Sequence, residues 1–302
     1  MRLIAMLAIW LDADDAITPA TLWSFQSWRW DAGIIVPLVV FAALYVVGAM
    51  RQRAALGRRH VYFALGWLSL VVALDSPLHP LGEQLFSAHM LQHEILILIS
   101  APLIAASRPG ATCLWALVPR HRAGVGGLVH RIESMKVVRM LTAPLTAWMV
   151  EAVVLWGWHI PSLYQATLTS DWVHAAQHLS FFLSALLFWS ALYGVGRSAM
   201  QYGAATFYVF GTAVHCSALG ALLTFSTVIW YPAYVGRTDA WGLTVLQDQQ
   251  LGGLLMWVPS GLVFIAVALV LFTRWLAESE KRTRLGSLQE VVDGRQRIED
   301  RG

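Results

Sequence analysis

The stretch LFSAHMLQHEILILISAPLIAA, residues 85–106, decides the fold class. It is apolar and long enough to cross a bilayer, whose hydrocarbon core takes about 20 helical residues to span. Stretches of similar character occur at 33–50, 61–74, 141–158, 173–195, 206–230 and 251–271. The second is short unless its helix extends toward Pro80. The sequence therefore predicts an all-α integral membrane protein, a bundle of seven transmembrane helices within residues 28–275.

The composition excludes several other classes of protein. Hydrophobic residues make up 57% of the 302 residues, charged residues only 13%, and the mean hydropathy is +0.58. A soluble domain carries about a quarter of charged residues, which it needs to cover its surface. This chain is therefore not expected to be an ordinary cytosolic enzyme, a disordered chain or a nucleic-acid module. The bilayer is its expected environment, and nucleic acid is not an expected partner.

The basic residues predict an orientation. Eighteen of the 21 Lys and Arg residues fall on one side of the predicted bundle, in groups at 51–59, 108–139, 197 and 274–301. Arg2, Arg29 and Arg237 fall on the other side. Because loops rich in Lys and Arg stay in the cytoplasm, the N-terminus is expected outside and the C-terminus inside.

The two ends of the chain are predicted to lie outside the membrane domain. Residues 1–27 begin with an apolar segment that is too short to span, so we expect a signal-like or interfacial segment. Whether residues 1–13 are cleaved stays open. Residues 276–302 are polar and are expected to form a cytoplasmic tail, either a fraying helix or disorder.

Two pairs of histidines open predicted spans from the outer side. His89 and His93 open the third span, and His174 and His178 open the fifth. A spacing of four places both imidazoles of a pair on one helix face. Ionisable groups at membrane depth are costly and mark functional sites by default, and imidazole suits copper, zinc and iron. We therefore predict a metal site made by these four side chains.

Five further residues form a second tier of candidates. His79 and His159 lie at the same membrane boundary. Asp248 could ligate metal or hold a ligand histidine in one tautomer, or else cap a helix. Met90 and Met256 offer thioethers, which suit Cu(I), although a single Met on a helix more often packs.

Glu151 and His215 lie near mid-depth in the fourth and sixth predicted spans. They could pair inside the bundle, as a structural contact or as a proton relay. No catalytic nucleophile and base stand out, so an enzyme is not predicted. A haem bridging the third and fifth helices, a copper permease and a scaffold with purely structural histidines stay open as alternatives.

Further motifs surround these residues. They are DSPL (75–78), FSAHMLQH (86–93), APL (101–103), RP (108–109), WHIP (158–161), LYQA (163–166), HAAQH (174–178), FW (188–189), LLTF (222–225), YPAY (231–234), DQQLGG (248–253) and MWVP (256–259). With these motifs the chain resembles the polytopic, seven-helix CtaG-type cytochrome c oxidase assembly factors over about residues 28–275. Two positions depart from the family's pattern: Gln177 stands where Glu is frequent, and Glu94 where an apolar residue is usual.

The resemblance implies a role in maturing haem–copper oxidase in the bacterial cytoplasmic (inner) membrane. It points to the copper insertion step on the outer side of that membrane. Copper would then be the metal bound, and oxidase subunits or a metallochaperone would be the partners.

Overall fold

The protein is described by a computed structural model, which covers residues 18–299 except 23, 25–26, 54, 56 and 195–199. Side chains are described up to residue 285. Residues 1–17, most of the predicted N-terminal segment, and residue 195, the predicted end of the fifth span, lie outside the described residues. In the part that is described, every regular element is a helix.

Among the described residues, six helical stretches are long and apolar enough to cross a membrane. They are α2 (Ala32–Gln52), α3 (Arg58–Leu74) continued by α4 (Leu78–Gln84), α5 (Phe86–Glu94) continued by the π-helix η2 (Ile95–Ser100) and α6 (Ala101–Ser107), α12 (Asp171–Leu192), α13 (Tyr202–Thr224), and the membrane part of α14 (Val245–Glu299). They correspond to six of the seven predicted spans, and the second does extend past Pro80. An all-helical membrane protein is therefore confirmed.

The remaining predicted span, 141–158, corresponds to α10 (Pro144–Trp158), which has 15 residues. At 1.5 Å per residue it is about 22 Å long, shorter than the roughly 30 Å hydrocarbon core. Prolines explain its length. Pro144 occupies the first turn of α10, and Pro161 begins the next helix after a break at His159 and Ile160.

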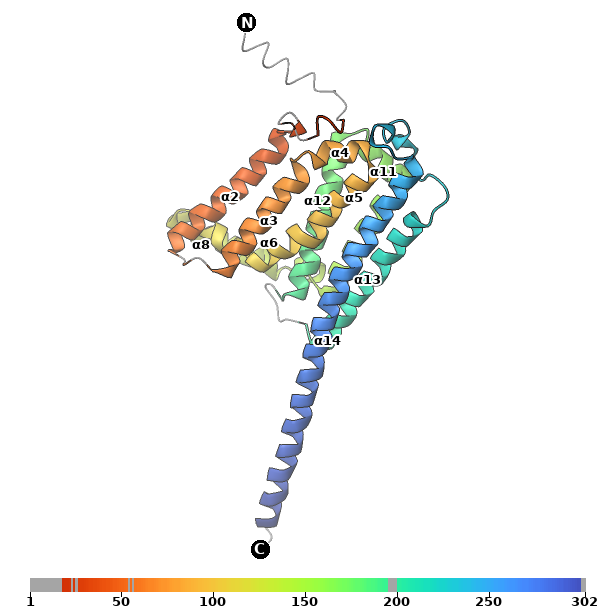
Figure 1. Cartoon of the computed structure of the whole chain (residues 1–302). Helices are drawn as coiled ribbons and strands as arrows, with labels where there is room; N and C mark the ends of the chain where they lie inside the picture. Colours follow the sequence, from red (N-terminus) through yellow and green to blue (C-terminus); the bar gives the residue numbers. More distant parts are fainter. Residues whose placement is uncertain are drawn as a thin grey trace.

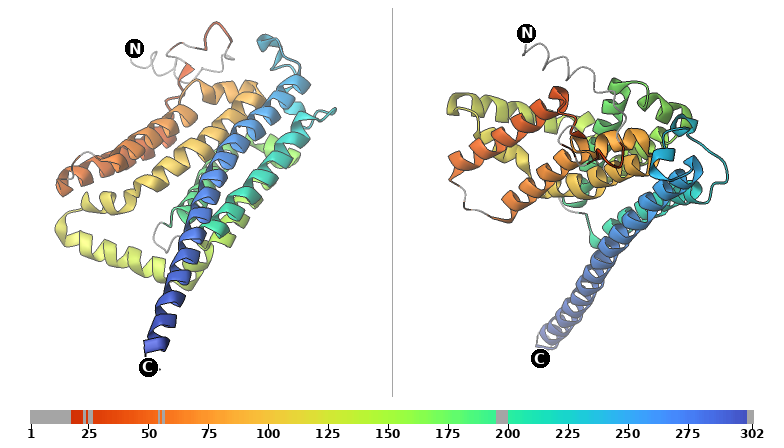
Figure 2. Two further views of the ribbon diagram at one scale, coloured as in Figure 1. Left: turned by 60° about the horizontal axis from the view of Figure 1, so that its bottom comes forward. Right: turned by 45° about the horizontal axis from the view of Figure 1, so that its top comes forward.

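Short helices complete the described fold: α7 (Pro109–Trp115), α8 (Pro119–Ser134), α9 (Lys136–Leu141), α11 (Pro161–Thr167), η3 (Pro232–Tyr234) and η4 (Asp239–Trp241). The long helices lie side by side, with α3, α5 and α12 in the middle of the bundle (Figure 1). α8 runs across one end of the bundle at a steep angle to them (Figure 2). α14 continues far beyond the other helices to Glu299, so the polar stretch after residue 275 is helical where it is described.

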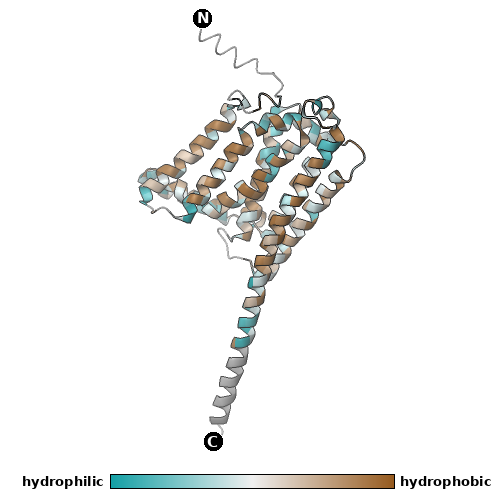
Figure 3. Ribbon diagram, in the orientation of Figure 1, coloured by the Kyte–Doolittle hydropathy of each residue, from teal (hydrophilic) through white to brown (hydrophobic). Residues whose placement is uncertain are grey.

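Apolar residues cover the helices, and hydrophilic residues interrupt the central ones toward the end at which α4 lies (Figure 3). On α2, Val36 and Val39 are more than half exposed, as side chains that face lipid would be. α13 and α14 pack at backbone distance. A Cβ added to Gly253 would lie 2.6 Å from the backbone nitrogen of Thr224 and 2.7 Å from the carbonyl oxygen of Gly220. This contact requires glycine.

Candidate metal centre

Five buried imidazoles gather between α4, α5 and α12. His79 comes from α4, His89 and His93 from α5, and His174 and His178 from α12. Each is at most 5% exposed. The break between α3 and α4, at residues 75–77, turns His79 toward the other four. We call these five side chains the imidazole cluster.

The two histidine pairs predicted from the sequence face each other. Within a helix, the ring centroids of His89 and His93 are 4.6 Å apart, and those of His174 and His178 are 4.4 Å apart. Between helices, His89 lies 4.9 Å from His174, and His93 lies 5.3 Å from His178. Helix periodicity and the packing of α5 against α12 thus place four rings around one small volume.

Two sets of three ring nitrogens lie within reach of a single ion. One set comes from His89, His93 and His178, the other from His79, His174 and His178, and in each set the nitrogens lie within 4.8 Å of one another. Two nitrogens that share an ion at about 2.0–2.1 Å stand roughly 3.3–3.6 Å apart. Rotamer shifts of about 1 Å would therefore close either set around a metal. His178 belongs to both.

Several nitrogens of the cluster are buried without a hydrogen-bond partner in the described part of the chain. They are Nδ1 of His89, both ring nitrogens of His93, Nε2 of His174 and Nε2 of His178. Buried polar groups are normally hydrogen-bonded, and an unsatisfied one costs about 1–3 kcal/mol. His93 is the extreme case, since neither its donor nor its acceptor is used. Such nitrogens fit a cation that binds imidazole lone pairs.

Two glutamines hold the rings in place. Oε1 of Gln177 lies 3.1 Å from Nε2 of His89, so that nitrogen donates and Nδ1 keeps its lone pair. Nε2 of Gln92 donates to the carbonyl oxygen of Ala73 at 2.7 Å and lies 3.4 Å from Nδ1 of His79. Partners of this kind fix the tautomer and orientation of ligand histidines. The sequence reasoning treated Gln177 only as a departure from a family pattern and missed Gln92.

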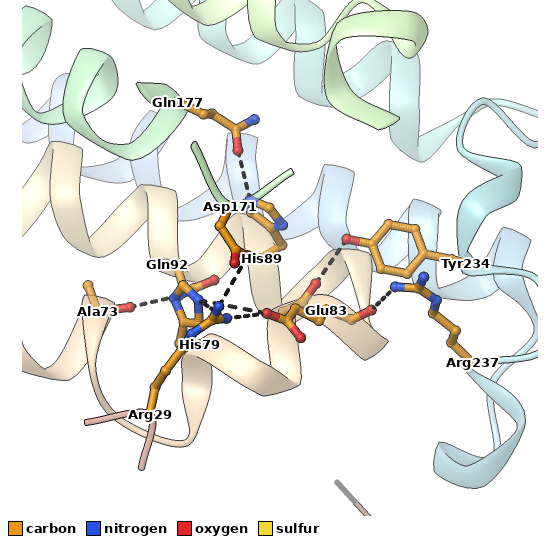
Figure 4. Close-up of polar contacts among 11 residues, drawn as sticks. Arg29, Ala73, His79, Glu83, His89, Gln92, Asp171, Gln177, Tyr234 and Arg237 are labelled. Atoms are coloured by element: carbon orange, nitrogen blue, oxygen red, sulfur yellow. Dashed lines mark hydrogen bonds and ion pairs between the residues drawn. The ribbon is translucent and has the colours of Figure 1, made fainter. Parts of the chain in front are cut away.

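Arg29 covers one edge of the imidazole cluster. Its Nη1 lies 2.9 Å from Nε2 of His79 and donates to Glu83, and its Nη2 lies 3.2 Å from Oδ1 of Asp171 (Figure 4). The guanidinium therefore occupies a nitrogen that the His79, His174 and His178 set would need. In the part of the chain that is described, no basic side chain hydrogen-bonds to His89, His93 or His178, so this set is the more available to a metal.

Asp248 acts on the imidazole cluster through α5. Its Oδ2 accepts a hydrogen bond from the backbone N–H of Phe86 at 2.6 Å, and its Oδ1 accepts one from that of Ser87 at 3.1 Å. α5 has no side-chain cap of its own, because Leu85 precedes it. A carboxylate there satisfies free N–H groups and favours the positive end of the helix dipole. Asp248 thus caps the helix that carries His89 and His93.

The remaining second-tier candidates lie close to the imidazole cluster or in the apolar core; they are His159, Met90 and Met256. Nδ1 of His159 donates to the carbonyl oxygen of Leu155 at 2.6 Å, and its Nε2 lies 3.4 Å from Sδ of Met90. Burial lowers the pKa of His159 to about 4, so the ring is neutral at neutral pH and Nε2 bears a lone pair. Met256 is buried in the apolar core with Phe86.

Glu151 and His215, which the sequence left unconnected, do meet. Oε2 of Glu151 lies 3.3 Å from Nε2 of His215.

These features define a polytopic membrane protein with a buried imidazole cluster between its central helices. The chain belongs to the cytochrome c oxidase caa3 assembly factor family, which matches residues 43–278. The resemblance predicted from the sequence is thereby confirmed.

Curated relatives include two uncharacterised mycobacterial proteins. One, from Mycobacterium leprae, is 25% identical over 271 residues, which is 85% of this chain and 40% of the relative. The other, from Mycobacterium bovis, is 25% identical over 269 residues, which is 84% of this chain and 40% of the relative. The chain thus spans about two fifths of the length of these relatives. No solved structure matches it.

Proposed function

We propose that this protein is an assembly factor for haem–copper cytochrome c oxidase that binds copper, as cargo, in the imidazole cluster. It hands the ion to an oxidase subunit or to a metallochaperone. The observation that carries the proposal is the state of His93: the side chain is 3% exposed, and neither ring nitrogen has a hydrogen-bond partner among the described residues. Because the chain belongs to a family of cytochrome c oxidase assembly factors, the oxidase is the proposed recipient of the bound metal.

His89, His93 and His178 are the proposed first ligands. Their nitrogens lie within 4.8 Å of one another, and Gln177 orients His89 with Nδ1 free. Imidazole is a good ligand for copper. His79, His174 and His178 are the proposed second set, which forms when Arg29 leaves Nε2 of His79.

We further propose that α10 is the seventh span, with the N-terminus outside and the C-terminus in the cytoplasm of a bacterial cell. The positive-inside rule supports this orientation, since the basic groups at 108–139 and 274–301 fall on one side. The imidazole cluster then lies toward the outer face, where copper delivery to an oxidase would take place. A C-terminal reporter that is active only in the periplasm is expected to stay inactive.

The decisive experiment measures copper in the purified protein after loading, for the parent and for the double variant His89→Ala/His93→Ala. The variant is expected to lose the bound copper. A matched control replaces His121 and His130, which are exposed on α8, with Ala, and it is expected to keep copper at the parental level. Full occupancy in the His89/His93 variant would exclude this site. A visible spectrum of the same sample tests the haem alternative, because a Soret band would contradict a copper cargo.

A further inference from the structure

A second group of metal-binding side chains lies apart from the imidazole cluster. Glu151 comes from α10, and His215 and Cys216 come from α13, about half way along that helix. One ligand atom from each lies within 4.8 Å of the others. Glu151 is 4% exposed and Cys216 is 9% exposed. No residue is shared with the imidazole cluster.

The contact between Glu151 and His215 has the distance of an ion pair but is not a hydrogen bond. Oε2 of Glu151 and Nε2 of His215 are 3.3 Å apart, and both atoms are buried without a hydrogen-bond partner in the described residues. Two ligands that share a metal at about 2.0–2.1 Å stand roughly 3.3 Å apart and point at the ion instead of at each other. The observed arrangement fits this geometry.

The third side chain, Cys216, indicates which class of metal ion this group of ligands would suit. Sγ of Cys216 lies 3.8 Å from Nδ1 of His215, and one ligand atom of each of the three residues lies within 4.8 Å of the others, so a thiol is close to both the imidazole and the carboxyl. A thiolate, an imidazole and a carboxylate together suit borderline and soft transition-metal ions such as Zn²⁺ or Cu(I), and do not suit Mg²⁺ or Ca²⁺.

We propose that Glu151, His215 and Cys216 form a second transition-metal site inside the helix bundle. On binding, the Cys216 thiol loses its proton and the sulfur bonds the metal. The proton passes to water, since metal binding to a thiol releases its proton. This proposal does not depend on the copper assignment of the imidazole cluster.

The test uses Co²⁺ as a spectroscopic probe with the full-length protein purified in detergent. The background variant is His89→Ala/His93→Ala, which removes the first ligand set of the imidazole cluster; the histidines that remain there supply no thiolate. Bound Co²⁺ is expected to give a thiolate-to-metal charge-transfer band in the near ultraviolet. Cys216→Ser should abolish this band, whereas Cys113→Ser, which alters the other cysteine, should leave it unchanged.

Glu151→Gln gives a second variant in case Cys216→Ser does not fold. It is expected to weaken Co²⁺ binding by roughly tenfold or more, because even changes outside the ligand set cost 10–100-fold. Absence of a thiolate band in the background protein, or a band that survives Cys216→Ser, would overturn the proposal. Loss of the band in Cys113→Ser would overturn it as well. None of these outcomes depends on whether copper binds His89 and His93.

Discussion

Replacement of Asp248 with alanine separates a capping role from a ligand role. Asp248 is fully buried and accepts hydrogen bonds from the backbone of Phe86 and Ser87 and from the Ser87 hydroxyl. Asp248→Ala leaves two buried N–H groups unsatisfied, at about 1–3 kcal/mol each. It also removes a charge at the helix N-terminus, worth about 0.3–1 kcal/mol at exposed sites and up to about 2 kcal/mol when buried. We expect a total loss of about 3–6 kcal/mol, and about half of that for Asp248→Asn, which keeps one acceptor oxygen.

The assay is thermal unfolding of the metal-free protein in detergent, followed by far-ultraviolet circular dichroism. A loss of 3–6 kcal/mol corresponds to a fall in Tm of roughly 5–15 °C. Asp239→Asn, at an exposed position in η4, is the matched control and should leave the Tm unchanged. Copper affinity should also fall in Asp248→Ala, because α5 carries His89 and His93.

A different pattern would refute this reasoning. If metal-free Asp248→Ala melts within about 2 °C of the parent, a buried cap has not been lost. If, in addition, only the copper-loaded protein loses stability, Asp248 acts as a ligand instead of a cap.

The other predictions concern metal binding and helix packing. His178→Ala should weaken copper binding more than His79→Ala, as measured by competition with a chelator, because His178 belongs to both ligand sets; equal effects would contradict this. Copper at about 100 times its Kd should stabilise the parent by about 2.7 kcal/mol, a gain that His178→Ala should lose in a thermal melt. Gly253→Ala should destabilise the protein by about 1–3 kcal/mol, since its Cβ would meet the α13 backbone at Thr224. Gly261→Ala, whose Cβ would have its nearest contact at 3.8 Å, should be neutral or slightly stabilising in the same melt, and equal losses in both variants would contradict the packing argument.

The sequence predicted those features that depend on composition and helix geometry alone. Apolar length is enough to identify a spanning helix, so six spans were found. The spacing of four in His89/His93 and His174/His178 fixes which face each pair occupies, whatever the rest of the fold does. One helix boundary was predicted wrongly. Hydropathy places the start of the fourth span at residue 141, but α10 begins at Pro144, because proline favours the first turn of a helix.

Contacts between distant segments could not be predicted in the same way. His79 reaches the cluster only because the chain breaks between α3 and α4, and Arg29 reaches His79 from a segment 50 residues earlier. Asp248 caps a helix that begins 162 residues before it, whereas sequence rules consider a residue as the cap of its own helix. Gln177 carries no signal by itself, since its partner, His89, is 88 residues away.

The π-helix η2 continues the segment that carries His89 and His93. It follows directly after Glu94, and π-helical turns free backbone groups from the regular ladder and are frequent at functional sites. Here the indole N–H of Trp189 on α12 donates to the carbonyl oxygen of Ile97 at 2.9 Å. Gln177, which contacts His89, also belongs to α12 and lies 12 residues, or about 18 Å, before Trp189. α12 therefore contacts this segment at His89 and again at Ile97, after His93, and these two contacts hold the histidines of α5 against those of α12.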